Sequence, residues 1–95
     1  MRHLGTIAPV AIALVTAAPA LAAELPRDVA AFVARRDRCD HFRGEESDDP
    51  ARRRAIRRGL EACRGTDAEL AWLKRRHAGD RDVRARLDRY EPDVE

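Results

Sequence analysis

From residue 24 onward, apolar residues recur every three or four positions, which is the spacing of one face of an α-helix. Four groups share this spacing: Val29, Phe32 and Val33; Ile56, Leu60 and Cys63; Leu70 and Leu73; and Val83, Leu87 and Tyr90. No run alternates Val, Ile or Tyr with polar residues, so strands are not expected. The pattern predicts an all-α fold, a compact bundle of three to four short helices.

Residues typical of helix ends separate these groups. Helix starts are indicated by Pro26, by Asp49 before Pro50, by the capping-box sequence Thr66-Asp67-Ala68-Glu69 and by Asp80. Gly65 and Gly79 predict the ends of the second and third helices. We therefore expect one small domain over residues 23–90 and a frayed tail over residues 91–95.

The first 22 residues have the composition of an export signal. Met1-Arg2-His3 is a basic start, an apolar run covers residues 7–18, and Ala20-Leu21-Ala22 fits the small-x-small rule of signal peptidase. We expect cleavage after Ala22, with Ala20 as the alternative position, and a periplasmic or secreted protein. An uncleaved membrane anchor is the competing interpretation, but the run is mostly Ala and contains Pro and Thr.

The composition excludes several classes of protein. Residues 23–95 keep 18 of the 19 basic residues and all 17 acidic ones. This near-neutral balance does not fit a polycation that coats nucleic acid, and aromatic residues for base stacking are scarce. The remaining 73 residues are too few for a Rossmann or TIM-barrel enzyme. We expect no nucleic-acid partner, and membrane contact only through the transient signal peptide.

Cys39 and Cys63 are the two cysteines of the chain, and both follow the export signal. An oxidising compartment makes a disulfide their expected state, and the chain has no Cys-x-x-Cys redox motif. Closing a loop of about 25 residues stabilises a chain by roughly 3.5 kcal/mol, which is comparable with the whole net stability of a domain this small. A Cys39–Cys63 disulfide is therefore predicted.

This disulfide constrains the segment between the first two helices. In a plain antiparallel hairpin, Cys39 would lie beside the start of the second helix, about 20 Å from Cys63 at a rise of 1.5 Å per residue. Bridged cysteines need Cα atoms within roughly 7 Å of each other. We therefore expect residues 40–49 to form an ordered strap that runs back along the second helix before that helix begins.

His41, Glu45 and Glu46 lie on this strap, with further carboxylates at Asp48 and Asp49. Such nitrogen and oxygen ligands bind zinc, copper, manganese or calcium, so a metal site is one hypothesis, although the spacing fits no His-Glu-x-x-His motif or calcium loop. The alternative is structural, because carboxylates at a helix N-terminus stabilise the fold without an ion. No cofactor is predicted. The single serine lacks a nucleophile motif, so no enzymatic activity is expected.

Five arginines between residues 52 and 58 form a basic cluster. If Ile56 faces the core, Arg54, Arg57 and Arg58 point outward. Guanidinium groups pair well with phosphate and carboxylate, so these three residues predict contact with an envelope protein or an anionic surface. The alternative is a solvated helix face whose charge is neutralised by the carboxylates of the strap.

Trp72 and Leu73 are adjacent on the third helix and point about 100° apart, so each needs its own neighbours to shield it from solvent. Trp72 therefore either completes the core or belongs to a surface that binds a partner. His77, in the turn after this helix, is expected to place favourable charge at the helix C-terminus when it is protonated.

The string Cys39-Asp40-His41-Phe42-Arg43-Gly44-Glu45-Glu46, with its later second cysteine, resembles a motif of a group of small exported bacterial proteins of unassigned function. Gly65-Thr66-Asp67-Ala68-Glu69-Leu70 and Ala78-Gly79-Asp80 extend the resemblance over roughly residues 37–87. That group has an aromatic residue soon after the two glutamates and a tyrosine at the position of His77, so Ser47-Asp48 and His77 depart from its pattern. The resemblance transfers no functional residues to this chain.

Together these features predict a non-enzymatic interaction or structural module of the cell envelope. A metal-binding protein that uses His41 and the two glutamates is a second hypothesis. An acid-stress chaperone is a third, because acid would neutralise the 17 carboxylates and leave a large positive charge that favours unfolding.

Overall fold

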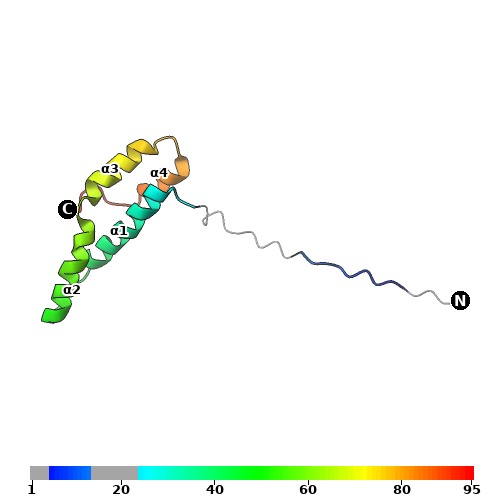
Figure 1. Cartoon of the computed structure of the whole chain (residues 1–95), viewed down its shortest axis with the longest axis horizontal. Helices are drawn as coiled ribbons and strands as arrows, with labels where there is room; N and C mark the ends of the chain where they lie inside the picture. The colour runs from blue at the N-terminus through cyan, green and yellow to red at the C-terminus, as the bar shows by residue number, and fades with distance from the viewer. Residues whose placement is uncertain (1–4, 14–23) are drawn as a thin grey trace.

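The structure is a computed structural model that describes residues 5–13 and 24–95. These residues contain four α-helices and one 3₁₀ turn: α1 (Arg27–Arg43), α2 (Pro50–Leu60), η2 (Glu61–Cys63), α3 (Thr66–Arg76) and α4 (Arg81–Leu87). The described residues contain no strand, so the all-α prediction is confirmed. α1 is central: it packs against α2, η2 and α3, and α3 in turn packs against α4 (Figure 1).

The chain as a whole is extended rather than compact, whereas the compact bundle was expected of residues 23–90 alone. Its Cα radius of gyration is 23.8 Å, and its principal extents are 86 × 41 × 17 Å. The reason is that residues 5–13 are exposed, form no helix and lie away from the helical part (Figure 1). Both expected cleavage positions, Ala20 and Ala22, lie outside the described residues. Among the described helices, none has the length and apolar character needed to cross a membrane.

Local hydrogen bonds explain where two of the helices begin. The carboxylate of Asp49 accepts the backbone N–H of Arg52 at 3.0 Å and so caps α2, which starts with proline as predicted. The carboxylate of Asp80 accepts the N–H groups of Asp82 and Val83, both at 3.1 Å, and so caps α4. These caps use residues two or three positions apart, which is why the sequence predicts them.

The predicted capping box at the start of α3 is wrong. Thr66 is the first residue of α3 rather than its N-cap, and its buried hydroxyl donates to the carbonyl of Cys63 at 2.7 Å. Gly65, with φ of 78°, turns the chain between η2 and α3 in the left-handed conformation that glycine favours. The N–H of Asp67 is capped instead by the distant carboxylate of Glu95, at 3.1 Å.

The hydrophobic core is built from α1, α3, α4 and the turn that follows α4. Its buried members are Val29, Phe32, Leu70, Leu73, Val83, Leu87 and Tyr90. The rings of Phe32 and Tyr90 meet edge to face, with centroids 5.3 Å apart. Burial, together with donation of its hydroxyl to Asp37 at 2.7 Å, raises the pKa of Tyr90 to about 12. This core holds α1 and α3 side by side.

The charged side chain of Arg36 is fully buried. It connects α1 with the start of α3 and with the C-terminal tail. Its Nε donates to Asp40 at 3.2 Å, its Nη1 lies 3.4 Å from the Thr66 hydroxyl and 3.5 Å from Asp67, and its Nη2 donates to the carbonyl of Glu91. These partners compensate for removing the guanidinium from water, which would otherwise be costly.

The C-terminal tail is docked, although the sequence predicts that it frays. The carboxylate of Asp67 accepts the backbone N–H groups of Val94 and Glu95 at 3.0 Å. The backbone hydrogen bond from Glu95 is the main cause that holds the pKa of Asp67 below its usual range. In addition, Arg43 lies 3.6 Å from the carboxylate of Glu91. The tail therefore closes over the start of α3 (Figure 1).

The predicted disulfide between Cys39 and Cys63 is present, with Cα atoms 4.7 Å apart. α1 continues one turn beyond Cys39 to Arg43, so the connection to α2 comprises residues 44–49 rather than 40–49. α2 starts beyond the end of α1 and runs back toward the disulfide (Figure 1). Residues 45–47 line a hollow together with residues 53, 56 and 57 of α2, so the connection does lie along α2 as expected.

Candidate functional site

α2 is held against α1 by a close contact between Phe42 and Gly59. Gly59 is buried, and a Cβ atom at this position would overlap the Phe42 ring at less than 3.0 Å. Ile56, which is 8 % exposed, completes the inner side of α2. Together with the disulfide, this packing fixes which face of α2 points to solvent.

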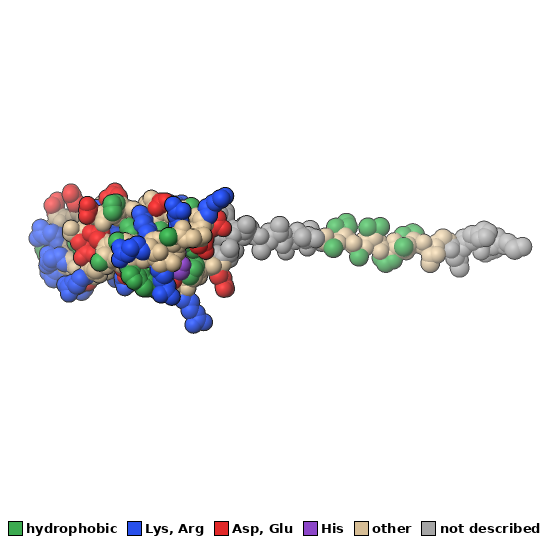
Figure 2. Space-filling view, turned by 90° about the horizontal axis from the view of Figure 1, so that it is seen from above, with side chains coloured by type: hydrophobic (Ala, Val, Ile, Leu, Met, Phe, Trp, Pro, Cys, Tyr) green, Lys and Arg blue, Asp and Glu red, His purple; other side chains and the backbone are tan. Residues whose placement is uncertain are grey.

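The outward face of α2 carries four exposed arginines that we call the α2 basic face: Arg53, Arg54, Arg57 and Arg58. None of them lies within ion-pair distance, 4.0 Å, of a carboxylate among the residues that the structure describes. The fifth arginine, Arg52, pairs with Glu45. α2 itself contains no acidic residue. Lys and Arg side chains gather at this end of the molecule (Figure 2, left).

The three arginines named as partner contacts from the sequence come together in one place. Arg54, Arg57 and Arg58 line an open hollow of about 370 Å³ with Glu61. The carboxylate of Glu61 is 2.9 Å from Arg64 and is thereby partly neutralised. A hollow rimmed by guanidinium groups suits phosphate or carboxylate, which arginine binds with two parallel hydrogen bonds.

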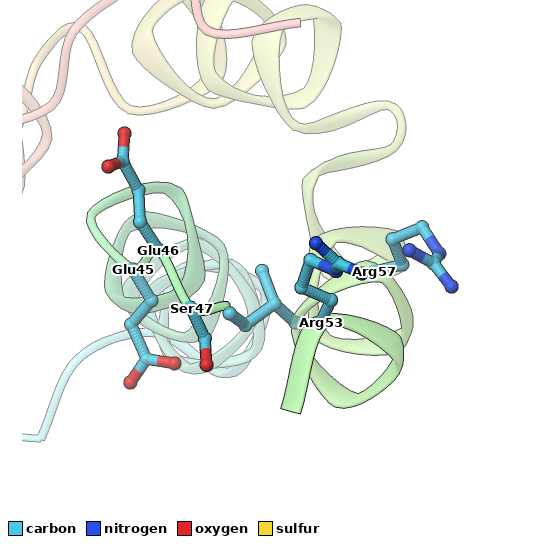
Figure 3. Close-up of a pocket in the computed structure, with 6 residues that line it drawn as sticks. Glu45, Glu46, Ser47, Arg53 and Arg57 are labelled. Atoms are coloured by element: carbon cyan, nitrogen blue, oxygen red, sulfur yellow. The ribbon is translucent and has the colours of Figure 1, made fainter. Parts of the chain in front are cut away.

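The expected metal ligands are not gathered around one point. His41 Nε2 lies 3.0 Å from Glu45, but the His41 side chain is 63 % exposed. Glu46 points away from Glu45, on the opposite side of the loop (Figure 3). Within the described residues, no three His, Cys, Asp or Glu side chains are placed to share an ion. Geometry therefore adds no support to the metal hypothesis.

Trp72 lies on the surface of α3 rather than in the core. The residue is 46 % exposed, whereas Leu70 and Leu73 are buried. The guanidinium of Arg76 is 5.1 Å from the centre of the Trp72 ring, a cation–π contact that covers part of it. Of the two alternatives for Trp72, the surface position is the one observed.

The structure also contains a partly buried contact between His77 and Asp28 that the sequence does not signal. His77 Nε2 is 3.0 Å from the carboxylate of Asp28, and Arg76 is 3.1 Å from the same group. The hydrogen bond from His77 is the main cause that lowers the pKa of Asp28. The two partners are 49 positions apart, so no local pattern links them. The pair joins the start of α1 to the end of α3.

A second hollow lies between the loop after α1 and the helix α2. It has a volume of about 290 Å³ and is lined by Glu45, Glu46, Ser47, Arg53, Ile56 and Arg57 (Figure 3). The sequence predicted that the loop runs along α2, but not that a hollow remains between the two.

Comparison with protein families, with curated proteins and with solved structures finds no match for this chain.

Proposed function

We propose that this protein is a non-enzymatic module of the cell envelope that binds an anionic surface through the α2 basic face. Export is supported by the Cys39–Cys63 disulfide, because such bonds persist in oxidising compartments. The ligand class follows from arginine chemistry, since the guanidinium fork matches phosphate and carboxylate groups.

One observation carries this proposal: four neighbouring arginines on α2 are exposed without a carboxylate partner among the described residues. α1, α3 and α4 all contain acidic residues, and ion pairs tie many of their charges together. Among the helices in the described part of the chain, α2 is the α-helix that has none. The cluster therefore keeps a net positive field, although the overall charge of the protein is only +2.

The expected attraction between the α2 arginines and an anionic membrane is sufficient for reversible binding. A basic residue close to an anionic membrane contributes about 1 kcal/mol, so three or four arginines together give roughly a hundredfold or greater preference for anionic over neutral lipid. This attraction is screened by salt over about 10 Å at moderate ionic strength, so binding should weaken as salt is added.

The test is co-sedimentation of the oxidised protein with phosphatidylcholine vesicles that contain or lack phosphatidylglycerol. We expect binding only to the anionic vesicles, and a loss of at least about tenfold for the variant Arg54→Ala/Arg57→Ala/Arg58→Ala. The proposal is wrong if this variant binds as well as the wild type.

The matched control removes three other exposed arginines: Arg81→Ala/Arg84→Ala/Arg89→Ala. These residues have no ion-pair partner among the described residues and lie on or just after α4, so the net charge changes equally at a different place. An equal loss of vesicle binding in both variants would mean that binding depends on the overall charge and not on the α2 basic face. Trp72 is the only tryptophan, so its emission also reports whether the α3 surface meets the vesicle.

A further inference from the structure

The hollow between the loop and α2 has a different character from the α2 basic face. Its exposed lining is mostly apolar, and Ile56 contributes to it. Its volume of about 290 Å³ is at the lower end of the range for small-molecule sites. A site of this size suits a compact polar group with a short apolar continuation rather than a large ligand.

The two walls of this hollow carry opposite charges. Glu45, Glu46 and Ser47 line it from the loop, and Arg53 and Arg57 line it from the helix. The Glu46 carboxylate and the Arg57 guanidinium point away from the space between them (Figure 3).

Glu45 is already engaged by His41 and Arg52. Glu46, Arg53 and Arg57 lie within 4.0 Å of no opposite charge in the described part of the chain, so the walls do not neutralise each other directly. A ligand with both a positive and a negative group can bridge them.

We propose that this hollow binds the headgroup of an aminophospholipid. The ammonium group is placed at Glu46, the phosphate at Arg53 and Arg57, and the first carbons of the apolar part against Ile56. Glu46 and Arg57 are both exposed, so the carboxylate and the guanidinium can turn over the hollow at little cost. This inference deepens the proposed function and rests on it, because Arg57 belongs to both surfaces and the lipid is presented by the same membrane.

Three features favour a lipid over a peptide or free phosphate. The described residues provide no sheet edge, so an extended peptide has no row of backbone groups to pair with. Free phosphate would leave Glu46 and Ile56 without a partner. The basic end of the molecule that holds α2 projects beyond α1, so the hollow can approach a flat surface (Figures 1 and 2).

The test uses soluble dihexanoyl phosphatidylethanolamine and dihexanoyl phosphatidylglycerol as monomeric probes. Ile56 is the only isoleucine after residue 12, so its methyl resonances report directly on the hollow. We expect these resonances to shift on titration and phosphatidylethanolamine to bind more tightly than phosphatidylglycerol. Phosphoethanolamine, which lacks the apolar part, should bind more weakly than the lipid; equal binding would overturn the assignment of the apolar contact.

The decisive variant is Glu46→Gln, with Asp48→Asn as a control of equal charge change on a loop residue that does not line the hollow. Losing one exposed ion pair should weaken phosphatidylethanolamine binding about three- to fivefold and leave phosphatidylglycerol binding unchanged. Ser47→Phe, which fills the hollow, should abolish both shifts. Equal affinity of Glu46→Gln and Asp48→Asn for phosphatidylethanolamine would overturn the inference.

Vesicle binding separates this inference from the proposed function. Glu46→Gln should still sediment with phosphatidylglycerol vesicles, because the α2 basic face is intact. If vesicle binding persists while neither soluble lipid shifts Ile56, the headgroup site alone is wrong. If the wild type does not bind anionic vesicles at all, the proposed function fails as well.

Discussion

Replacement of Gly59 by alanine tests how α2 is positioned, because helix propensity and packing predict opposite outcomes. Gly59 lies inside the last turn of α2, where alanine favours the helix by up to about 1 kcal/mol over glycine. Propensity alone therefore predicts that Gly59→Ala stabilises the protein.

Packing predicts the reverse. The new Cβ would lie less than 3.0 Å from three carbons of the Phe42 ring, so the ring or the helix must move. Overpacking of this kind typically costs about 1–3 kcal/mol. After the gain in propensity is subtracted, we expect a net destabilisation of about 1 kcal/mol, and a melting temperature lower by roughly 4–8 °C for a domain of this size.

Thermal and urea unfolding followed by circular dichroism measure this difference. Gly79→Ala is the control, because nothing lies within 4 Å of a Cβ at that position, and its stability should change little. In a Phe42→Ala background the clash is absent, so Gly59→Ala should become neutral or stabilising. A higher melting temperature for Gly59→Ala in the wild-type background would refute the reasoning.

Two further predictions concern the buried charge and acid. Arg36→Ala should lower the free energy of unfolding, measured in urea, by about 3 kcal/mol or more. Arg36→Met should lose less stability because it keeps the packing of the side chain. Equal stability of the wild type and Arg36→Ala would contradict this prediction. The lowered pKa values of Asp28 and Asp67 stabilise the fold above the ordinary carboxyl value of 3.8, and this stability is lost as pH falls below it toward their folded pKa values. Between pH 5 and about pH 2, the free energy of unfolding of Asp28→Asn and of Asp67→Asn should therefore fall less with decreasing pH than that of the wild type. An equal fall in the variants and the wild type would contradict this prediction.

The acid prediction also bears on the chaperone hypothesis. Asp28 links the start of α1 to the end of α3, and Asp67 holds the C-terminal tail. Protonation of both would loosen the two ends of the helical part together. An acid-activated protein needs such a trigger, and the unfolding curves show whether it operates.

Much of the fold follows from neighbouring residues. Asp49 and Asp80 cap helices because their side chains reach an N–H only two or three residues away, and Gly65 accepts a left-handed turn that other residues avoid. The outward direction of Arg54 and Arg57 follows from their angular distance from Ile56 on one helix. Such local relations do not depend on which helices meet.

The remaining features depend on contacts between distant segments. Arg36 is buried because α1, the start of α3 and the tail surround it, and the hollow at Glu46 exists because the loop doubles back beside α2. The spacing of the two cysteines indicates that the loop follows α2, but no spacing encodes the packing around Arg36 or the side chains that line the hollow. They are set by which helix faces bury the most apolar surface and by where the disulfide allows α2 to lie.

The sequence by itself therefore determined the helical class, most helix ends, the Cys39–Cys63 pairing and the composition of a basic α2. Only the tertiary structure decided that Trp72 is exposed, that the tail docks on Asp67 and that the α2 arginines lack carboxylate partners in the described residues. The physical reason is range: caps and helix faces are fixed within one turn of helix, whereas the burial of Arg36 and its contacts with Thr66 and Asp67 depend on segments 30 or more residues apart.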